Sequence, residues 1–340
     1  MRRLSVFLLA VAVAFPLIAG KMSRWKAEVV DEILRPDIPE SDSLGGVAWV
    51  SNNVYWAVTD EKWHPVVWEL EFPMDAITGK LNACHMKILC RPQKANDIEG
   101  LALDPFDGSI WLVDEREGCI GQYDPKTGMR LEGVVELPAV MRGFQRDFGM
   151  ESLTIGKDGL SMWTCSEESL RADGPRSTRK QGSDVRLTRL AREKEKKTAR
   201  WKATGQWVYR TDPIAGGPWY NADNEECSRS GVSELCLLED GTLLVLEREF
   251  SVVVVPRFRC RIYEVDLSKA TDVLNRSSVK DVQGLVRVEK RLVFETTGFA
   301  MYEGMCTGPK LADGSRLLVL VADGDKRALR SVMALRLSPR

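Results

Sequence analysis

Asn96-Asp97-Ile98-Glu99-Gly100-Leu101-Ala102-Leu103 is the stretch whose pattern the rest of the chain repeats. An acidic residue lies beside Gly or Ser, and a short apolar run follows it. A turn with Asp-Gly then leads to a second apolar run that ends in acid, here Trp111-Leu112-Val113-Asp114-Glu115. A theme that recurs in this way is typical of stacked or radial repeat architectures.

The unit occurs five times. The other four copies are Leu44–Trp49 with Trp56–Asp60, Gly149–Thr154 with Met162–Glu167, Val232–Leu237 with Leu244–Glu247, and Tyr302–Cys306 with Val319–Asp323. Short β-branched and aromatic runs between turn residues favour strands over helices. Each unit divides into four strands, except that the last lacks its fourth strand. The unassigned run Trp25–Leu34 supplies it.

These units predict an all-β fold, a β-propeller of five four-stranded blades closed by an N-terminal strand. Ring closure from both termini leaves only short, protected sheet edges. In the second unit the four strands are 98–103, 110–113, 119–123 and Gly133–Leu137. Six blades remain an alternative, because the gaps from unit three to four and from four to five are longer than the others.

The composition bounds the class of protein. The 340 residues are 44% apolar, enough for one large all-β domain or two ordinary ones. A net charge of −1 gives no global field that favours nucleic acid or an anionic membrane. We expect a monomer whose charge-driven function depends on local clustering.

The N-terminus predicts export. Arg2 and Arg3 precede the apolar run Leu4–Ile18, and small residues follow it, as in a secretory signal. We therefore expect a signal peptide over residues 1–20, a propeller domain over 25–340, and a periplasmic or secreted protein without a stable membrane span. The alternative is an uncleaved anchor, although the run is shorter than the roughly 20 residues that a spanning helix needs.

Eight cysteines are an even number, which permits disulfides in an oxidising compartment. The alternative is that several are small buried apolar residues, which suits Cys236 and Cys306 within strand patterns. The pairs that we predict are Cys84 with Cys90 and Cys227 with Cys260.

The acids of the repeats are expected to meet. The first strand of a propeller blade lines the central channel and the second runs back, so the start of one and the end of the other share a channel mouth. First strands begin with Glu99, Glu151, Glu234 and Glu303, whereas Gly45 takes this place in the first unit. Second strands end with Asp60, Glu115, Glu167, Glu247 and Asp323.

Nine carboxylates at one rim cannot all stay ionised unless they are paired with cations or bound to metal. Oxygen ligands without clustered His or thiolate suit Ca²⁺ first, and Mg²⁺ or Mn²⁺ second. The rim is predicted to hold a metal and an anionic group together. The alternative is that each acid accepts hydrogen bonds that lock blade to blade. Cations that lie beside the acids in the sequence are Lys62, Arg116, Arg248 and Lys326.

Other catalytic schemes fit poorly. The chain has two histidines, His64 and His85, and lacks a Gly-x-Ser-x-Gly elbow, a Walker loop and a dinucleotide fingerprint. His64 follows the first acidic strand end closely and is a candidate general acid or base.

The largest irregular segment is Leu170–Lys202, which is strongly basic. We interpret it as a solvated insertion, partly helical at Leu187–Ala199, or as a cationic flap over an anionic ligand. A second insertion, Ser268–Gln283, is polar and has no evident chemistry.

The set Asp-Ile-Glu-Gly-Leu, Gly-Met-Glu-Ser-Leu, Gly-Val-Ser-Glu-Leu and Tyr-Glu-Gly-Met, with Leu-Val-Leu-Glu-Arg-Glu and Val-Ala-Asp-Gly-Asp, resembles the phytase-like domain family over roughly 41–337. The resemblance implies an exported bacterial protein with esterase-like activity of phytase. By analogy with calcium-dependent propeller phytases, it implies rim acids that bind a metal, which would hold a phosphate and activate water. The chain departs from that pattern at Gly45 and in its basic insertion.

We therefore hypothesise an exported, metal-dependent hydrolase of phosphate esters or related esters, with a small anionic substrate. Glu99, Glu151, Glu234 and Glu303 are the predicted catalytic acids, and they bind Ca²⁺ together with the strand-end acids. Arg116 and Arg248, with Lys62 and Lys326, are the predicted substrate-binding cations. Two alternatives remain: a calcium-dependent lactonase-like propeller, and a non-catalytic envelope module that binds a ligand or protein.

Overall fold

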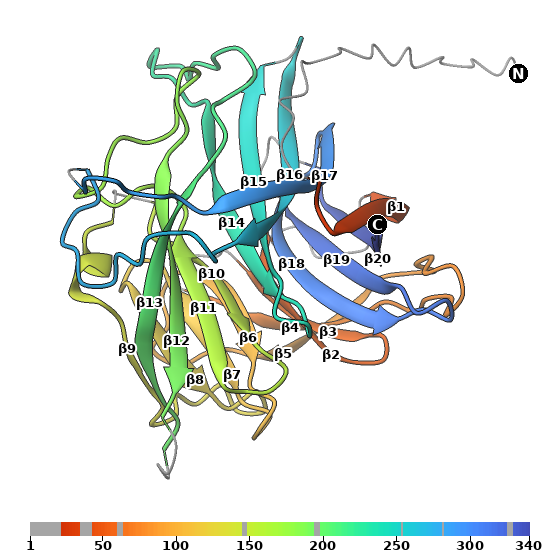
Figure 1. Ribbon diagram of the computed structural model, residues 1–340. Coiled ribbons are helices and arrows are strands. Elements are labelled where there is room, and N and C mark those ends of the chain that lie inside the picture. The colour runs from red at the N-terminus through yellow and green to blue at the C-terminus, as the bar shows by residue number, and fades with distance from the viewer. Residues whose placement is uncertain are drawn as a thin grey trace, which may run out of the picture.

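Small antiparallel sheets surround a central channel in the computed structural model (Figure 1). It describes residues 22–34, 43–59, 64–144, 148–193, 198–252, 254–280, 282–324 and 329–340. The expected signal segment at 1–20 and the candidate residues Asp60, Lys62 and Lys326 lie outside the described residues. The described part forms a five-bladed, all-β propeller, as predicted.

The first three blades follow one another along the chain. Blade one holds β2 (Leu44–Ser51), β3 (Val54–Thr59), β4 (Val67–Glu71) and β5 (His85–Cys90). Blade two holds β6 (Ile98–Leu103), β7 (Ile110–Asp114) and β8 (Cys119–Tyr123). Blade three holds β10 (Met150–Ile155), β11 (Ser161–Ser166), β12 (Asp184–Arg192) and β13 (Arg200–Arg210). A 3₁₀ turn, Ala139–Arg142, precedes blade three.

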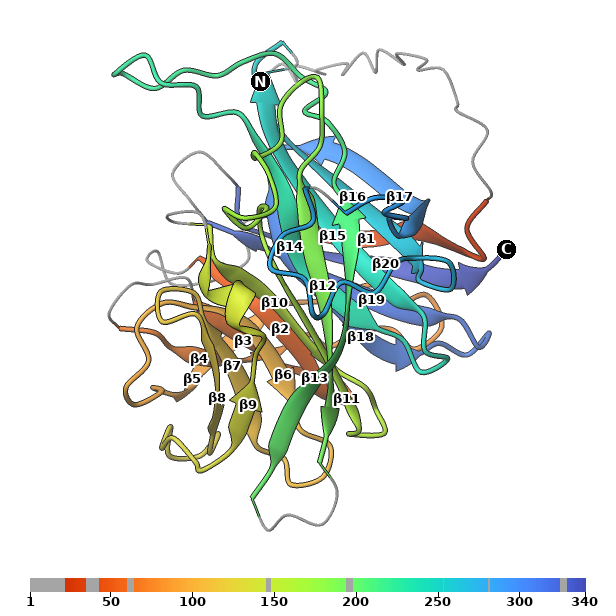
Figure 2. The same ribbon diagram turned by 60° about the vertical axis from the view of Figure 1, so that its left-hand side comes forward.

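The last two blades complete the ring. Blade four holds β14 (Arg229–Leu237), β15 (Leu243–Val252), β16 (Pro256–Asp266) and β17 (Glu289–Gly298). Blade five holds β18 (Met301–Lys310), β19 (Arg316–Asp323), β20 (Ser331–Pro339) and β1 (Trp25–Leu34). Figure 2 shows the green strands of blade three between the yellow strands of blade two and the cyan strands of blade four.

The N-terminal strand closes the ring, as the missing strand of the fifth unit predicted. β1 pairs antiparallel with β20, from Trp25 opposite Pro339 to Leu34 opposite Ser331. The two ends of the described chain therefore meet in one sheet (Figure 1). Because the outer edge of blade five is a strand from the other terminus, unfolding of either terminal strand exposes the edge of the other.

The predicted outer strand of blade two belongs to another sheet. Within Gly133–Leu137 the structure forms β9 (Val134–Glu136), which pairs in parallel with β13 of blade three. Val134 lies opposite Arg200 and Glu136 opposite Lys202. The pairing gives the backbone groups on the outer edge of β13 hydrogen-bond partners. Because the two strands lie far apart in the sequence, the repeat pattern does not predict it.

The expected helical stretch at Leu187–Ala199 is wrong. The first part of it belongs to β12, and β13 begins at Arg200. Val185 and Leu187 are fully buried and pack with Tyr209 between blades three and four. Their spacing of two residues places them on one face of a strand, whereas a helix would separate them.

The core is divided among the junctions between blades. Five apolar clusters lie between blades one and two, two and three, three and four, four and five, and five and one. A cavity of about 410 Å³ follows the channel. Its walls include one equivalent residue from each innermost strand: Val47, Leu101, Leu153, Leu235 and Met305.

Neither predicted disulfide is present among the described residues, because Cys90, Cys227 and Cys260 carry free thiols. Cys84 precedes β5 and Cys90 ends it. A strand advances about 3.3 Å per residue, so this span is far longer than the roughly 7 Å limit between bridged Cα atoms. The buried Cys236 and Cys306 fit the alternative interpretation as small core residues.

Candidate functional site: the acidic mouth of the channel

The repeated glutamates sit on β-bulges. In blade two, Ile98 pairs with Asp114 and Gly100 with Val113, so Glu99 is the extra, unpaired residue. Glu151 and Glu303 occupy the same position in β10 and β18. A bulge re-aims the side chain of its extra residue and ends regular pairing. The repeat therefore places each carboxylate by backbone geometry at one end of the innermost strand.

The small residue after each glutamate allows the blades to approach. A Cβ on Gly100 would lie 2.6 Å from the carbonyl oxygen of Glu151 in the next blade. A Cβ on Gly304 would lie 2.2 Å from the carbonyl oxygen of Gly45. Both distances are shorter than a van der Waals contact, so these positions require glycine. The same Glu-Gly dipeptide thus places the acid and lets neighbouring blades pack closely.

Blade four is offset by one residue from the prediction. Val232 pairs with Glu247 and Glu234 with Leu246, so Ser233, not Glu234, is the bulge residue. Gly231 pairs with Arg248. In blades two and three the second strand continues past the pair beside the bulge into an acid, Glu115 in blade two and Glu167 in blade three. In blade four that residue is Arg248, not Glu247.

The displaced acids of blade four have other partners. Glu234 is buried and accepts hydrogen bonds from the backbone N–H groups of Leu153 at 3.1 Å and Leu235 at 2.9 Å. Glu247 accepts hydrogen bonds from the Tyr209 hydroxyl at 2.5 Å and the Lys290 ammonium at 2.6 Å. Glu247 thus belongs to a polar network that joins blades three and four.

The remaining acids do converge. Burial raises the pKa of Glu151 well above its ordinary value, and the charges of its neighbours raise it further. Arg248 in turn interacts with the charges of Glu151 and Asp323. We call this group the acidic mouth. Its members are Glu99, Glu115, Glu151, Glu167, Glu303, Asp323 and Arg248.

Arg248 lies within the acidic mouth as its internal cation. Its Nη2 is 2.6 Å from Glu167 Oε1 and its Nε is 2.8 Å from Glu303 Oε1. Burial raises the pKa of Glu167, and the guanidinium of Arg248 opposes that increase. Arg248 was predicted to contact the substrate, whereas in the structure it forms ion pairs with carboxylates of blades three and five.

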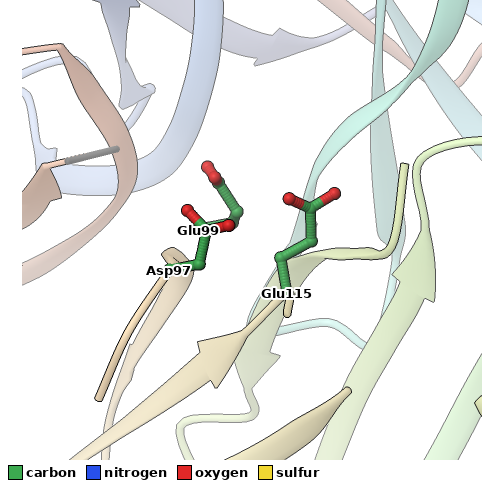
Figure 3. Close-up of side chains that lie close together, drawn as sticks. All are labelled: Asp97, Glu99 and Glu115. Carbon is green, nitrogen blue, oxygen red and sulfur yellow. The ribbon is translucent and has the colours of Figure 1, made fainter. Parts of the chain in front are cut away.

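Three acids on the blade-two side are close enough to share a cation. One oxygen from each of Asp97, Glu99 and Glu115 lies within 4.8 Å of the other two, and Figure 3 shows the three side chains turned into one space. Oxygen ligands 2.3–2.6 Å from Ca²⁺ lie at most about 5 Å apart, so this donor set fits a hard divalent ion. Asp97 was missed as a ligand, although it lies two residues before Glu99 in the opening stretch.

Two arginines adjoin the mouth or the residues next to it. Arg116 is exposed beside Glu115. Arg229, which sequence analysis did not single out, lies 3.3 Å from Glu168 and stacks over the Phe148 ring at 4.0 Å. His64 is exposed, and its role as a general acid or base stays a prediction.

The basic insertion is less of a flap than its composition indicated. Arg186 belongs to β12 and is buried in a bidentate ion pair with Asp173, at 2.6 and 2.8 Å. Arg189 and Arg192 also lie on β12, where Arg192 stacks over Phe106 and Trp201. Arg186 and Arg192 therefore tie blade three to the segments that pack against it, and these arginines do not face a ligand as a group.

Glu234 gives a prediction on pH dependence. Burial raises its pKa well above the ordinary 4.5, so the folded state keeps a proton that the unfolded state loses above that pH. The wild-type protein is therefore expected to lose stability as pH rises from about 5 to 8. Glu234→Gln, which still accepts both hydrogen bonds, removes the share of this loss that comes from Glu234, while the raised pKa values of Glu151 and Glu167 still contribute theirs. In chelator, thermal melting should show little difference between the two proteins at pH 5 and a more stable variant at pH 8.

The matched control is Glu132→Gln, because Glu132 is an exposed residue of the segment between β8 and β9. It should melt like wild type at both pH values. If the melting temperatures of wild type and Glu234→Gln change with pH in the same way across this range, the raised pKa of Glu234 is contradicted.

Comparison with known proteins identifies a family. Residues 41–326 match the family described as Phytase-like: Esterase-like activity of phytase. No curated protein matches the chain. Similar solved structures include a PQQ-bound aldose sugar dehydrogenase from Streptomyces coelicolor, with 11% identity, a TM-score of 0.41, and coverage of 94% of this chain and 100% of that one. A streptogramin B lyase shows 12% identity, a TM-score of 0.36, and coverage of 92% and 98%.

Proposed function

This chain belongs to the phytase-like family, and from that premise we propose that it is an exported, metal-dependent hydrolase of phosphate esters or related esters that acts at the acidic mouth. The observation that supports the proposal is the asymmetry of the mouth. Oxygen donors of Asp97, Glu99 and Glu115 gather on the blade-two side, within 4.8 Å of one another. Arg248 and Arg229 lie toward blade four.

Asp97, Glu99 and Glu115 would hold the divalent ion, with Ca²⁺ favoured by an all-oxygen donor set. Bound there, the ion would supply positive charge to a phosphoryl or carbonyl oxygen and lower the pKa of water. Glu115 also accepts a hydrogen bond from the backbone N–H of Gly149 at 2.6 Å, which fixes one of its oxygens across the junction of blades two and three. The ligand set is thus held by two neighbouring blades.

Glu151 is positioned to manage a proton. Burial and the charges of four neighbouring acids raise its pKa, which favours the protonated carboxyl. A protonated carboxyl can donate to a leaving alkoxide, and the ionised form can accept the proton back. We assign Glu151 this general-acid role.

The anionic part of a substrate needs a cation that is not already saturated. Arg229 is 24% exposed and has one carboxylate partner, Glu168. The Phe148 ring beneath it holds the guanidinium plane in place. Arg229 is therefore the residue that we propose to contact a phosphate or carboxylate, and Arg116 is a second candidate because it is exposed beside Glu115.

The direct test is an assay of purified protein stripped with chelator. Generic phosphomonoesters, carboxylic esters and sugar lactones should be supplied separately, each with Ca²⁺, Mg²⁺ or Mn²⁺. We expect hydrolysis of an ester that returns with Ca²⁺ and disappears with chelator, and that is about tenfold slower in Arg229→Gln with KM raised. No turnover of any substrate with any ion would overturn the hydrolase. Turnover of the lactones alone would move the substrate class to lactones.

A further inference from the structure

Among the four blades in which both mouth positions are described, blade four is the exception in the charge pattern. Blades two, three and five each place two acids there, at the bulge and after the second strand: Glu99 and Glu115, Glu151 and Glu167, and Glu303 and Asp323. Blade four places Ser233 and Arg248 at the same two positions. It therefore removes two negative charges from the mouth and adds one positive charge.

The added charge is held firmly. The Arg248 side chain is 16% exposed, and two different nitrogens contact two different blades, Glu167 of blade three and Glu303 of blade five. Each contact is a charge-assisted pair shorter than 3 Å. A guanidinium fixed by opposed carboxylates cannot turn toward a substrate without giving up one of these two buried charge-assisted contacts, which is costly.

We propose that Arg248 is a resident cation that fills the blade-four side of the mouth, so that the mouth takes a single divalent ion, at Asp97, Glu99 and Glu115. This inference rests on the proposed metal binding. The two halves of the mouth solve one electrostatic problem in different ways. Glu167 and Glu303 are neutralised by a side chain of the protein itself, whereas one oxygen from each of Asp97, Glu99 and Glu115 lies close enough to the other two to share a divalent ion.

The proposal has a consequence for folding. Arg248 lets blades three, four and five assemble without metal, because the carboxylates that meet there already have a counter-charge. Its loss would leave Glu167 and Glu303 facing each other with oxygens that a divalent ion can bind. Removal of the arginine should therefore create a second divalent site and make the stability of the protein depend on calcium.

The experiment compares wild type, Arg248→Gln and Arg248→Lys. Calorimetric titration with Ca²⁺ should give about one site in wild type and in Arg248→Lys, and about two in Arg248→Gln. In chelator, Arg248→Gln should melt at least about 5 °C below wild type, and millimolar Ca²⁺ should restore most of that loss. Arg248→Lys keeps the charge and should lose less stability. No substrate enters either measurement.

A double variant protects the test if Arg248→Gln does not fold. Arg248→Gln with Glu303→Gln removes the pair together, so it should fold in chelator and should not gain a second site. One calcium site in both wild type and Arg248→Gln would overturn the resident-cation role but leave the proposed function standing. No site in wild type and one in Arg248→Gln would overturn the proposed metal centre and support the role of Arg248. No site in either protein would overturn both.

Discussion

Replacing Glu99 by Gln is expected to abolish calcium binding at the acidic mouth and to lower ester hydrolysis at least 100-fold. Glu99 provides one of the three converging oxygens and is the bulge residue that the backbone aims into the mouth. Gln has almost the same shape but no charge, and an uncharged amide is a poor replacement for a carboxylate around a divalent ion. Loss of a residue that only hydrogen-bonds to a metal ligand already lowers metal affinity or activity by about 10–100-fold, so loss of a ligand itself should lower them more.

The variant should nevertheless fold, and this separates loss of function from loss of structure. Glu99 repels Glu151 in the apo mouth, where its charge helps to raise the pKa of that residue. Removal of the charge therefore relieves repulsion, and Glu99→Gln should melt at or slightly above the wild-type temperature in chelator. Calcium should then raise the melting temperature of wild type but not that of the variant.

Calorimetry, melting with and without Ca²⁺, and kcat/KM on the best ester substrate measure these effects together. Glu132→Gln is the matched control, since Glu132 is an exposed acid in the segment that follows blade two, and it should equal wild type in all three. Full calcium affinity in Glu99→Gln would contradict the ligand set. Full activity without calcium binding would show that the ion serves structure alone.

The ring could be predicted because every blade carries the same short-range sequence signals. Each copy carries its own turn and alternating strands, and the strand that the fifth copy lacks lies near the other terminus. The pairing of β1 with β20 follows from that count, whereas the register that sets Trp25 opposite Pro339 does not. The short β9 could not be predicted in its true place. Its parallel partner, β13, lies more than sixty residues away and belongs to another blade.

The blade-four acids were misplaced because a strand has a period of two, so a one-residue slip moves every side chain to the other face. Ser233-Glu234-Leu235 offers two acceptable alignments to Glu99-Gly100-Leu101. The pairing of Val232 with Glu247 selects the one in which Ser233 is the bulge residue. The same slip replaces Glu247 by Arg248. A signal was present in the sequence, since alignment on the following leucine puts Glu234 where the other blades have Gly or Ser.

The ion pair of Arg186 and Asp173 is expected to be among the costliest in the molecule to break. The Arg186 side chain is 1% exposed and that of Asp173 is not exposed at all. Arg186 Nη1 also donates to the carbonyl oxygen of Arg276 at 2.8 Å, and Asp173 Oδ1 accepts from the backbone N–H of Val279 at 3.0 Å. The pair therefore joins β12 to both insertions of the chain.

Arg186→Met should destabilise the protein by about 3–5 kcal/mol, because it leaves a buried carboxylate without its cation. Denaturant unfolding followed by tryptophan fluorescence measures the change. Arg200→Met is the matched control. It breaks the pair with Glu136, whose side chains are 39% and 49% exposed, and such a pair contributes under about 1 kcal/mol.

A second variant distinguishes the ion pair from the packing of the arginine stem. Arg186→Met with Asp173→Leu removes both charges, so it should recover at least half of the stability that Arg186→Met loses. Limited proteolysis should locate the effect, with cleavage of the single variant concentrated in 170–183 and 268–280, the segments that the pair ties down. An Arg186→Met protein that unfolds within about 1 kcal/mol of wild type would show that the insertions are held by their apolar contacts, in which Val273 and Val279 pack against Val208.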